Sequence, residues 1–580
     1  MNPFIPVWEC PRKILVAFFG AFLIGLCLFL QVREAHSQIT PQQRDETYRQ
    51  AAPGRFDKRF EKEKLPSPTV VPVQPDSLRP IFPDELKNLE FKLKRLIIQG
   101  STVYQDRKLL PLYRNFLGKK INLTHIYRIA NAMTRKYRND GYILSRVVVP
   151  PQKIEKGVVR LQVVEGHIDQ VQIKGKVVGA KNLINAYRRG ILRSRPLHAK
   201  DLERYLLLME DLPGISVKSV LLPSEDQSGT SDLTVILENK RFDASVGVDN
   251  RGSGFNGPLQ IFAGGGINSV GGLNDRLRFQ GVVTSETEEL LFLSGAYDLP
   301  LSKEGTRLFF SAAFSESEPG ETLKQFDVEG DSQSFSLRVS HPFIRSRGEN
   351  LSAHFGFTYK DSETKILGTQ DSEDRLRIFE VEVSYDNADR FRGVNLTTLR
   401  LSKGLDILDA TDSGSPNLSR SSGQSDFLKL SGEFARLQQL APSWNLLGAM
   451  SWQYSFEKLL APEEFGVGGA RFGRAYDSSE ITGDQGVAMK LEFQKAFQFR
   501  NKYFKNMQAY TFIDYGSVWN RVATSVGKTQ ENISSAGLGL RFNLKKWVSG
   551  YIEFDKPINK DVAAEGNRDV RFFFSVSAAF

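Results

Sequence analysis

The chain has 580 residues, of which 40% are hydrophobic, 25% charged and 11% aromatic, and its formal net charge is +10. It is too long for one ordinary compact domain and too apolar for a disordered chain, so we expect several folded units. After residue 31 there is no run of about 18 apolar residues, which excludes a membrane protein built from several hydrophobic helices.

Residues 1–37 have the pattern of a secretory signal peptide. Two basic residues precede an apolar run over 14–30, and the small residues Ala35 and Ser37 precede a predicted cleavage point before Gln38. The alternative is that the apolar run is retained as a membrane anchor. Behind a secretory signal, nucleic acid is not an expected partner.

The predicted mature chain offers no thiol chemistry. Both cysteines, Cys10 and Cys27, lie in the predicted signal peptide, so we expect neither a disulfide nor a thiolate metal site. The glycine run 264–266 is not followed by a helix, as a phosphate-binding loop would require. We therefore predict no metal and no cofactor.

The segment after the cleavage point divides in two. Residues 38–64 are strongly polar, and Thr40 followed by Pro41 resembles a helix N-cap with proline in the first turn, which predicts a helix. Residues 65–88 contain six prolines, which favour an extended and fairly stiff linker. A helix on such a linker can bind at a distance from the domain that follows.

Two α+β modules follow, over residues 89–166 and 167–240. In the first, the hydrophobic pattern predicts the order β-α-α-β-β, with helices over 106–117 and 123–139. The same order recurs in the second module, so the two form a tandem repeat.

The first module carries most of the positive charge. Between Phe91 and Glu165 there are sixteen lysines and arginines against four acids, an excess larger than the net charge of the whole chain. Such a surface could attract an acidic unfolded client or anionic lipid headgroups. The alternative is a solvated face that only keeps the domain soluble.

Residues 241–580 show an all-β pattern with sixteen segments that alternate between apolar and polar side chains. Short turns alternate with long loops, which is typical of a sixteen-stranded antiparallel β-barrel in an outer membrane, with both chain ends in the periplasm. The aromatic last strand ends at Phe580, which we interpret as the C-terminal signal of the barrel. The predicted fold class is therefore mainly β, with the barrel preceded by two periplasmic α+β domains. The alternative is a soluble β-sandwich or propeller.

Short motifs accompany this architecture. They are the stretches 141–146, 149–152 and 164–166 in the first module, and Asp249-Asn250-Arg251-Gly252 at the first barrel strand. Together with the two modules and the barrel, they resemble the outer-membrane transporters of two-partner secretion, the haemolysin secretion/activation family. In that family the α+β modules are POTRA domains. The resemblance covers essentially the whole predicted mature chain.

The resemblance implies a function and a location. A transporter of this kind exports a large unfolded exoprotein, such as an adhesin or haemolysin, from the periplasm to the surface of a Gram-negative cell. The POTRA domains would capture the client by β-augmentation, the barrel would be the pore, and the helix over 38–64 would plug it. The implied partners are the exoprotein and outer-membrane lipids, with periplasmic chaperones and the barrel assembly machinery during biogenesis.

The longest loop, over 457–485, resembles a family loop that folds back into the barrel lumen. In the family its tip has the sequence Val-Arg-Gly-Tyr, and here the corresponding residues are Gly473, Arg474, Ala475 and Tyr476. Gly473 and Ala475 depart from the family pattern, whereas the arginine and the aromatic residue are kept.

The expected partner of Arg474 is an acid on the inner wall. Phe512-Ile513-Asp514 resembles a family strand motif, and strand alternation places Asp514 on the same face as Gln508, Tyr510 and Phe512. A shielded Arg474–Asp514 pair would be charge-assisted and would act as a latch on the loop. The alternative is that Arg474 is an ordinary solvated loop charge.

Two other classes of function remain. An assembly or insertion factor of the same superfamily would share the barrel and the inward loop, although such proteins usually carry more POTRA domains. An outer-membrane enzyme would need a nucleophile and a base. Only His341 and His354 lie in the barrel region, and neither belongs to a recognisable catalytic set, so we predict no enzymatic activity and no catalytic residue.

Overall fold

The computed structural model describes most of the chain from residue 90 onward. The described residues are 53–60, 66, 90–177, 179, 181–224, 229–499, 504–521, 529–544 and 547–580. The predicted signal peptide (1–37) lies outside them, as do most of the predicted helix 38–64 and of the linker 65–88. Among the helices described, none is both long enough and apolar enough to cross a bilayer.

The first module is a small sheet covered by one long helix. Its elements in chain order are β1 (Glu90–Lys92), β2 (Arg95–Gln99), α4 (Asp106–Leu109), β3 (Lys120–Asn122), α5 (Leu123–Asn139), β4 (Arg146–Val148) and β5 (Val158–Val164). The main sheet has the order β2-β5-β4. The apolar face of α5, with Ile126, Ile129 and Met133, belongs to one core with Leu96 and Leu161 of the sheet.

The predicted helix over 106–117 is wrong in its length. Helix α4 ends at Leu109, and two 3-10 turns follow, Leu110–Leu112 and Arg114–Phe116. Pro111 lies in the first of these turns. Since proline has no amide hydrogen and clashes with the preceding turn, it stops the α-helix there.

The second module repeats the order β2-α4-α5-β4-β5 of the first module, without described counterparts of β1 and β3. It contains β6 (His167–Lys174), α6 (Lys181–Arg193), α7 (Ala199–Glu210), β7 (Ile215–Pro223) and β8 (Thr230–Asn239). The sheet has the order β6-β8-β7, so β7 is an edge strand that pairs with β8 alone among the described strands. The hydrophobic core of the second module, with Ile184, Tyr187 and Leu208, is separate from the core of the first module.

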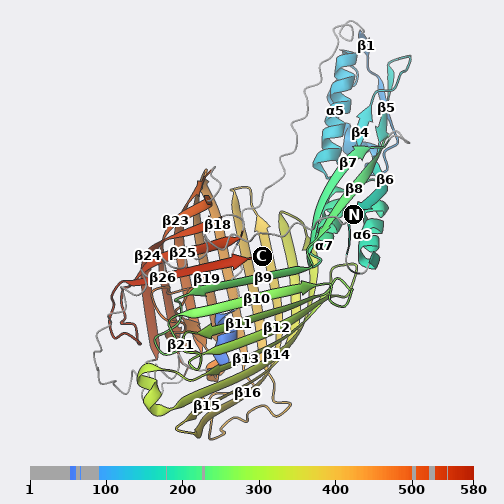
Figure 1. Cartoon of the computed structure of the whole chain (residues 1–580). Coiled ribbons are helices and arrows are strands. Elements are labelled where there is room, and N and C mark those ends of the chain that lie inside the picture. The colour runs from blue at the N-terminus through green and yellow to red at the C-terminus, as the bar shows by residue number, and fades with distance from the viewer. Residues whose placement is uncertain are drawn as a thin grey trace, which may run out of the picture. The chain divides into compact units, whose positions relative to one another are not determined.

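The remaining chain forms a closed sixteen-stranded antiparallel barrel, which confirms the predicted fold class (Figure 1). Its strands are β9 (Phe242–Asp249), β10 (Gln260–Asn268), β11 (Arg276–Thr284), β12 (Leu291–Pro300), β13 (Arg307–Ser317), β14 (Val328–Arg345), β15 (Glu349–Ile366), β16 (Thr369–Ala388), β17 (Gly393–Gly404), β18 (Leu428–Ala441), β19 (Trp444–Ser455), β22 (Gln485–Gln498), β23 (Phe504–Trp519), β24 (Gln530–Leu544), β25 (Val548–Pro557) and β26 (Arg571–Ala579). Strand β26 pairs with β9 and closes the ring.

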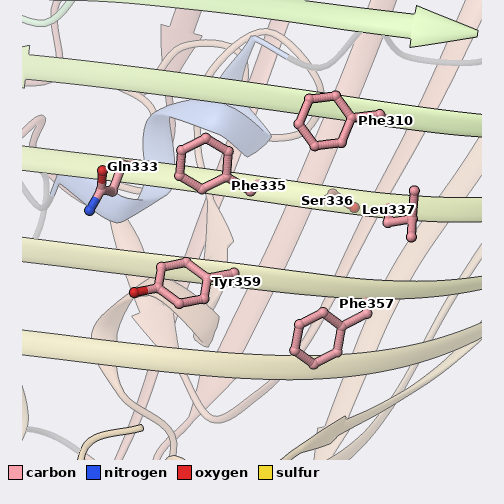
Figure 2. A pocket seen from close by; sticks show the side chains of 7 residues that line it. All are labelled: Phe310, Gln333, Phe335, Ser336, Leu337, Phe357 and Tyr359. Carbon is pink, nitrogen blue, oxygen red and sulfur yellow. The ribbon is translucent and has the colours of Figure 1, made fainter. Parts of the chain in front are cut away.

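The outer face of the barrel is apolar. In β14, Leu337 is 49% exposed and Phe343 is 59% exposed, while the neighbours of Leu337 in the strand, Ser336 and Arg338, are polar. Figure 2 shows outward side chains of β13, β14 and β15, including Phe310, Phe335 and Phe357, which line a shallow groove. Large exposed apolar surface is costly in water and suits the hydrocarbon core of a membrane.

Two elements between β19 and β22 leave the wall. Among the described strands, β20 (Phe465–Val467) and β21 (Ile481–Gly483) pair only with each other, and we call residues 465–483 the inward hairpin. Its apolar side chains, among them Val467, Phe472 and Ile481, pack against lumen residues of β18, β22, β23 and β24. The long loop therefore fills part of the barrel instead of extending from it.

Candidate functional site in the barrel lumen

The tip of the inward hairpin is a tight turn. The amide of Tyr476 donates to the carbonyl of Gly473 at 2.9 Å, and Gly473 has φ +77°. A Cβ at that position would lie 3.0 Å from Cδ1 of Ile533, so both conformation and space favour glycine. Ala475 is absent from the residues with positive φ, so the departure from the family glycine causes no backbone strain.

Arg474 and Asp514 lie together in the lumen. The Nε of Arg474 donates to Oδ2 of Asp514 at 3.0 Å, and Nη2 donates to Oδ1 at 2.9 Å, which makes the pair bidentate. The side chains are 4% and 0% exposed. The backbone amides of Gly473 and Arg474 donate to the same carboxylate at 3.1 and 3.0 Å. One acid on β23 thus holds both the side chain and the backbone of the hairpin tip.

Further acids that the sequence analysis did not single out surround Arg474. Glu492 on β22 accepts from Nη1 at 2.6 Å, and Glu553 on β25 lies 3.8 Å from the same nitrogen. The guanidinium carbon is 3.4 Å from the ring centre of Phe512. Glu492 is the register neighbour of Phe512. Glu492 could have been identified from the sequence as an acid on the inner face of the strand that precedes the Asp514 strand.

Two more arginines hold the backbone of the tip. Arg251, just after β9, donates from Nη1 to the carbonyl of Arg474 at 2.7 Å. Arg571 on β26 donates to the carbonyl of Ala475 at 2.9 Å and to Oδ1 of Asp477 at 2.7 Å. Arg251 belongs to the motif at the first barrel strand, whereas nothing in the sequence marked Arg571.

Comparison with known proteins identifies the family. The family model described as haemolysin secretion/activation protein ShlB/FhaC/HecB matches residues 229–542, and the ShlB-type POTRA domain matches residues 91–166. The first match alone covers more than half of the chain. The chain belongs to the haemolysin secretion/activation family.

Relatives agree with this assignment. The heme/hemopexin transporter protein HuxB of Haemophilus influenzae (strain 86-028NP) is 22% identical over 82% of this chain and 85% of that protein. The outer membrane transporter CdiB-2 of Burkholderia pseudomallei (strain 1026b) is 23% identical over 90% of this chain and 88% of that protein. The solved structure of CdiB from Escherichia coli has a TM-score of 0.70 at 20% identity, covers 94% of this chain and is itself covered completely, which shows a shared fold.

This family member is an outer-membrane transporter of two-partner secretion, with its POTRA region in the periplasm, as the sequence analysis predicted. The alternative of a soluble β-sandwich or propeller is wrong, because the strands close into one barrel. The family match favours the transporter over the assembly factor.

The two remaining predicted site residues lie apart from each other. Tyr476 is 1% exposed, and its hydroxyl donates to the carbonyl of Lys560 at 3.0 Å, beyond the end of β25. Phe580 is 64% exposed and stacks on Trp547 with 6.3 Å between ring centres. Its amide donates to the carbonyl of Ala244 at 2.8 Å, so the last residue extends the closure between β26 and β9.

Residues 53–60, which we call the lumen segment, lie within the ring of strands (Figure 1, blue). They form a 3-10 turn, Pro53–Arg55, and one helical turn, α3 (Phe56–Arg59), the only described part of the predicted helix 38–64. Phe56 packs on the inward residues Val282 and Phe292.

The lumen segment is tied to the root of the inward loop. Arg55 pairs with Glu464 at 2.5 Å, and their side chains are 9% and 3% exposed. Lys58 donates to the carbonyl of Pro462 at 2.7 Å and lies 3.3 Å from Glu463. Both acids belong to, or adjoin, the 3-10 turn Ala461–Glu463 that begins the loop.

Proposed function

We propose that this transporter exports one large unfolded exoprotein through its barrel, after the lumen segment leaves and the inward hairpin adjusts. The observation that carries the proposal is that the lumen of a closed barrel is filled by two segments that are not part of its wall. A barrel that serves only as a structural support does not need such segments in its lumen, whereas a pore that opens and closes needs segments that block it.

The Arg474–Asp514 pair would act as the latch of the hairpin. Both side chains are shielded from solvent, and the arginine also contacts Glu492. Removing one member of a buried pair leaves an uncompensated charge and costs about 3–5 kcal/mol. The hairpin would therefore hold its place until the client or a movement of the wall rearranges the pair.

The lumen segment would act as the plug. It is short, and its polar anchors are concentrated on Glu463 and Glu464. These acids keep other partners without it, because Lys429 lies 2.5 Å from Glu463 and Arg420 lies 3.0 Å from Glu464. Its departure would leave no unpaired acid, so it is suited to reversible release.

The periplasmic modules would capture the client. The edge strand β7 exposes Val220 (46%) and Leu222 (57%), and its outer edge is unpaired among the described strands. An extended client can add to such an edge through backbone hydrogen bonds, while apolar side chains add affinity with little sequence dependence.

The basic surface of the first module would favour an acidic client segment. Arg95 on β2, Arg146 on β4 and Arg160 on β5 are exposed and alternate with the buried residues of the same strands, so they share the open face of the sheet. Such a surface raises the rate of encounter with an oppositely charged chain. The outward apolar wall would contact outer-membrane lipids, and chaperones with the barrel assembly machinery would serve biogenesis.

Quantitative proteomics of spent medium and outer membranes, with and without this gene, tests the proposal. We expect loss of one or a few very large proteins from the medium, with the outer-membrane profile intact. A broad decrease of many outer-membrane barrels would instead establish an assembly factor and overturn the proposal.

A further inference from the structure

One wall of the lumen is lined by hydroxyl side chains. In β13, β14 and β15 the outward residues are large and apolar, for example Phe310, Leu337 and Phe355, which are 45–50% exposed. Many of the alternate, inward residues are small and carry hydroxyl groups. The strand register aligns six of them in two cross-strand rows, Ser311–Ser336–Thr358 and Ser315–Ser332–Ser362. We call these six residues the hydroxyl wall. Lys360 of β15, the register partner of Ser334, lies between the two rows.

The other wall is covered. The inward hairpin packs on Leu396 of β17, Ala435 of β18 and Ala449 of β19, and on residues of β22, β23 and β24. Its tip is held by charged side chains from β22, β23 and β26. The hairpin therefore separates these strands from the open lumen, and the hydroxyl wall lies on the side that it leaves uncovered.

The lumen segment occupies the space between the hairpin root and the hydroxyl wall. Lys360 of β15 donates to the carbonyl of Gly54 at 3.3 Å. A Cβ at Gly54 would lie 2.7 Å from Cγ of Pro462 and 3.3 Å from Oγ of Ser362. Figure 2 shows the blue ribbon of this segment behind β13 to β15, on the side opposite the outward aromatic side chains. The lumen segment therefore fits closely against both the hairpin root and the hydroxyl wall.

We propose that the client crosses the barrel along the hydroxyl wall, as an extended polypeptide in the space that the lumen segment fills in this structure. This inference rests on the proposed transport function and assigns the surface within the barrel that performs it. The partner that the wall fits is an unfolded chain recognised through its backbone.

The chemistry of the wall suits a moving chain. An unfolded polypeptide carries amide donors and carbonyl acceptors that need partners wherever water is displaced. A hydroxyl both donates and accepts, and its hydrogen rotates to suit the group that arrives. Thr358 already donates to the hydroxyl of Ser336 at 3.1 Å, so each hydroxyl can exchange a neighbour for the client. The six hydroxyl side chains are small and uncharged, so they offer no apolar or ionic trap for particular client residues. The charge of Lys360, which lies between the two rows, is paired with Glu463 at 3.6 Å.

A paired tryptophan experiment tests the path. The double variant Ser336→Trp with Thr358→Trp narrows the lumen at two neighbouring positions of the same wall. The double variant Leu337→Trp with Phe357→Trp is the matched control. The control residues are the chain neighbours of the first pair, face lipid, and are likewise register partners. We expect the inward pair to lower the amount of exoprotein in the medium about tenfold or more, since a close-packed passage does not absorb added volume, while the outward pair secretes normally. Equal secretion by both variants would overturn the path.

The inward tryptophans could prevent folding, which would be seen as loss of the heat-modifiable band on gels. A second double variant with smaller changes is used in that case. Ser336→Ala with Thr358→Val removes two hydroxyls and adds almost no volume. We expect the rate of secretion in a pulse-chase experiment to decrease about threefold, since backbone groups of the client lose partners there. An unchanged rate of secretion would show that the hydroxyl wall takes no part in transport.

Thiol labelling tests the overlap with the lumen segment without any client. The chain has no cysteine after Cys27, so a single introduced cysteine reports alone in the barrel. Ser362→Cys should react slowly with a membrane-impermeant maleimide in the full chain and several-fold faster after deletion of residues 53–60. Ser451→Cys, two residues along β19 from the hairpin contact Ala449, should not respond to the deletion. Equal labelling of Ser362→Cys in both chains would show that the segment does not cover the wall.

Failure of the transport function and failure of the assigned path give different results in these experiments. If deletion of the gene leaves the medium unchanged, the transport function itself is wrong. If the exoprotein depends on the gene but the inward and outward tryptophan pairs secrete alike, transport stands and the assigned path is wrong.

Discussion

The inward hairpin and the lumen segment fill the same barrel by different means. The hairpin is joined to the wall at both ends, and its tip places Arg474 in a bidentate pair whose members are almost fully shielded. The lumen segment also has one shielded pair, Arg55 with Glu464, at 9% and 3% exposed, while its Lys58 stays 44% exposed beside Glu463. What distinguishes the two parts is therefore their attachment, because the hairpin is continuous with the wall strands β19 and β22, whereas the described contacts of the lumen segment with the wall are non-covalent.

The largest expected effect comes from the fixed part. Arg474→Ala leaves Asp514 and Glu492 buried, with a cost of about 3–5 kcal/mol to the hairpin position. We expect secretion to be lost while the barrel remains heat-modifiable, as measured by exoprotein in the medium and by gel shift. Asp514→Ala should have a similar effect.

The matched control lies on the same hairpin. Arg471 pairs with Glu433 at 2.8 Å, and the two side chains are 34% and 46% exposed. Exposed pairs contribute about 0–1 kcal/mol, so Arg471→Ala should secrete almost normally. Equal defects in Arg471→Ala and Arg474→Ala would show that shielding is not what fixes the hairpin.

The next effect concerns the removable part. Deletion of residues 53–60 should raise the conductance of the transporter in planar bilayers, because the segment fills the lumen beside the hairpin root. Arg55→Ala should raise the open probability more than Lys58→Ala, since the Arg55–Glu464 pair is buried on both sides. An unchanged current in the deletion variant would exclude the plug.

An intermediate effect should follow from loosening the hairpin backbone. Arg251→Ala with Arg571→Ala removes the donors to the carbonyls of Arg474 and Ala475. We expect faster hydrogen exchange of the amides over 473–477, while the Arg474–Asp514 pair keeps the tip in the lumen. Arg541→Ala serves as the control, because Arg541 binds Glu492 at 2.5 Å without a described hydrogen bond to the hairpin. If hydrogen exchange becomes equally fast in this control, Arg251 and Arg571 have no specific role in holding the hairpin backbone.

The smallest effect lies outside the barrel, at Glu165. Burial opposes its ionisation, but hydrogen bonds from Thr102, Val103 and Tyr137 outweigh burial and lower the pKa of its carboxyl. The unfolded carboxyl has a pKa of about 4.3, so near that pH the folded state binds fewer protons than the unfolded state. This stabilisation is present above pH 4.3 and is lost as the pH falls through the lower folded pKa.

Thermal unfolding of the periplasmic fragment 90–239 measures this contribution. We expect Glu165→Gln to lower the melting temperature by a few degrees at pH 7, where the wild type has the charged form, and by less at pH 3. A difference that grows as the pH falls would contradict the assigned sign. Glu155→Gln is the control, because no described side chain pairs with it.

Sequence patterns predicted those parts of the molecule that depend on local order. Alternation along each strand and the spacing of turns indicated sixteen strands, and the resemblance of the loop and of the Asp514 strand motif pointed to Arg474 and Asp514. The helix over 106–117 was wrong because the apolar period continues through Pro111, which the backbone cannot follow.

The acids and arginines around the latch depend on register instead. Glu492, Glu553 and Arg571 are inward charges like many others in a polar lumen, and each meets the hairpin only because its strand lies beside, or closes onto, the Asp514 strand. Without the pairing of distant strands, nothing separates them from ordinary lining residues. The resemblance implied that a helix over 38–64 plugs the barrel. The contacts of the lumen segment with Glu463, Glu464 and Lys360 depend on the folded barrel and could not be predicted.

The closure of the barrel has a mechanical consequence. Strands β26 and β9 share five aligned residue pairs, from Ser575 with Asp249 to Ala579 with Ser245, whereas β15 and β16 share eighteen. A load applied at Phe580 acts on the shortest ladder of hydrogen bonds in the ring. Force spectroscopy on the C-terminus should therefore extract β26 first, at a lower rupture force than the central strands, and the chain should unzip from its last hairpin toward its first.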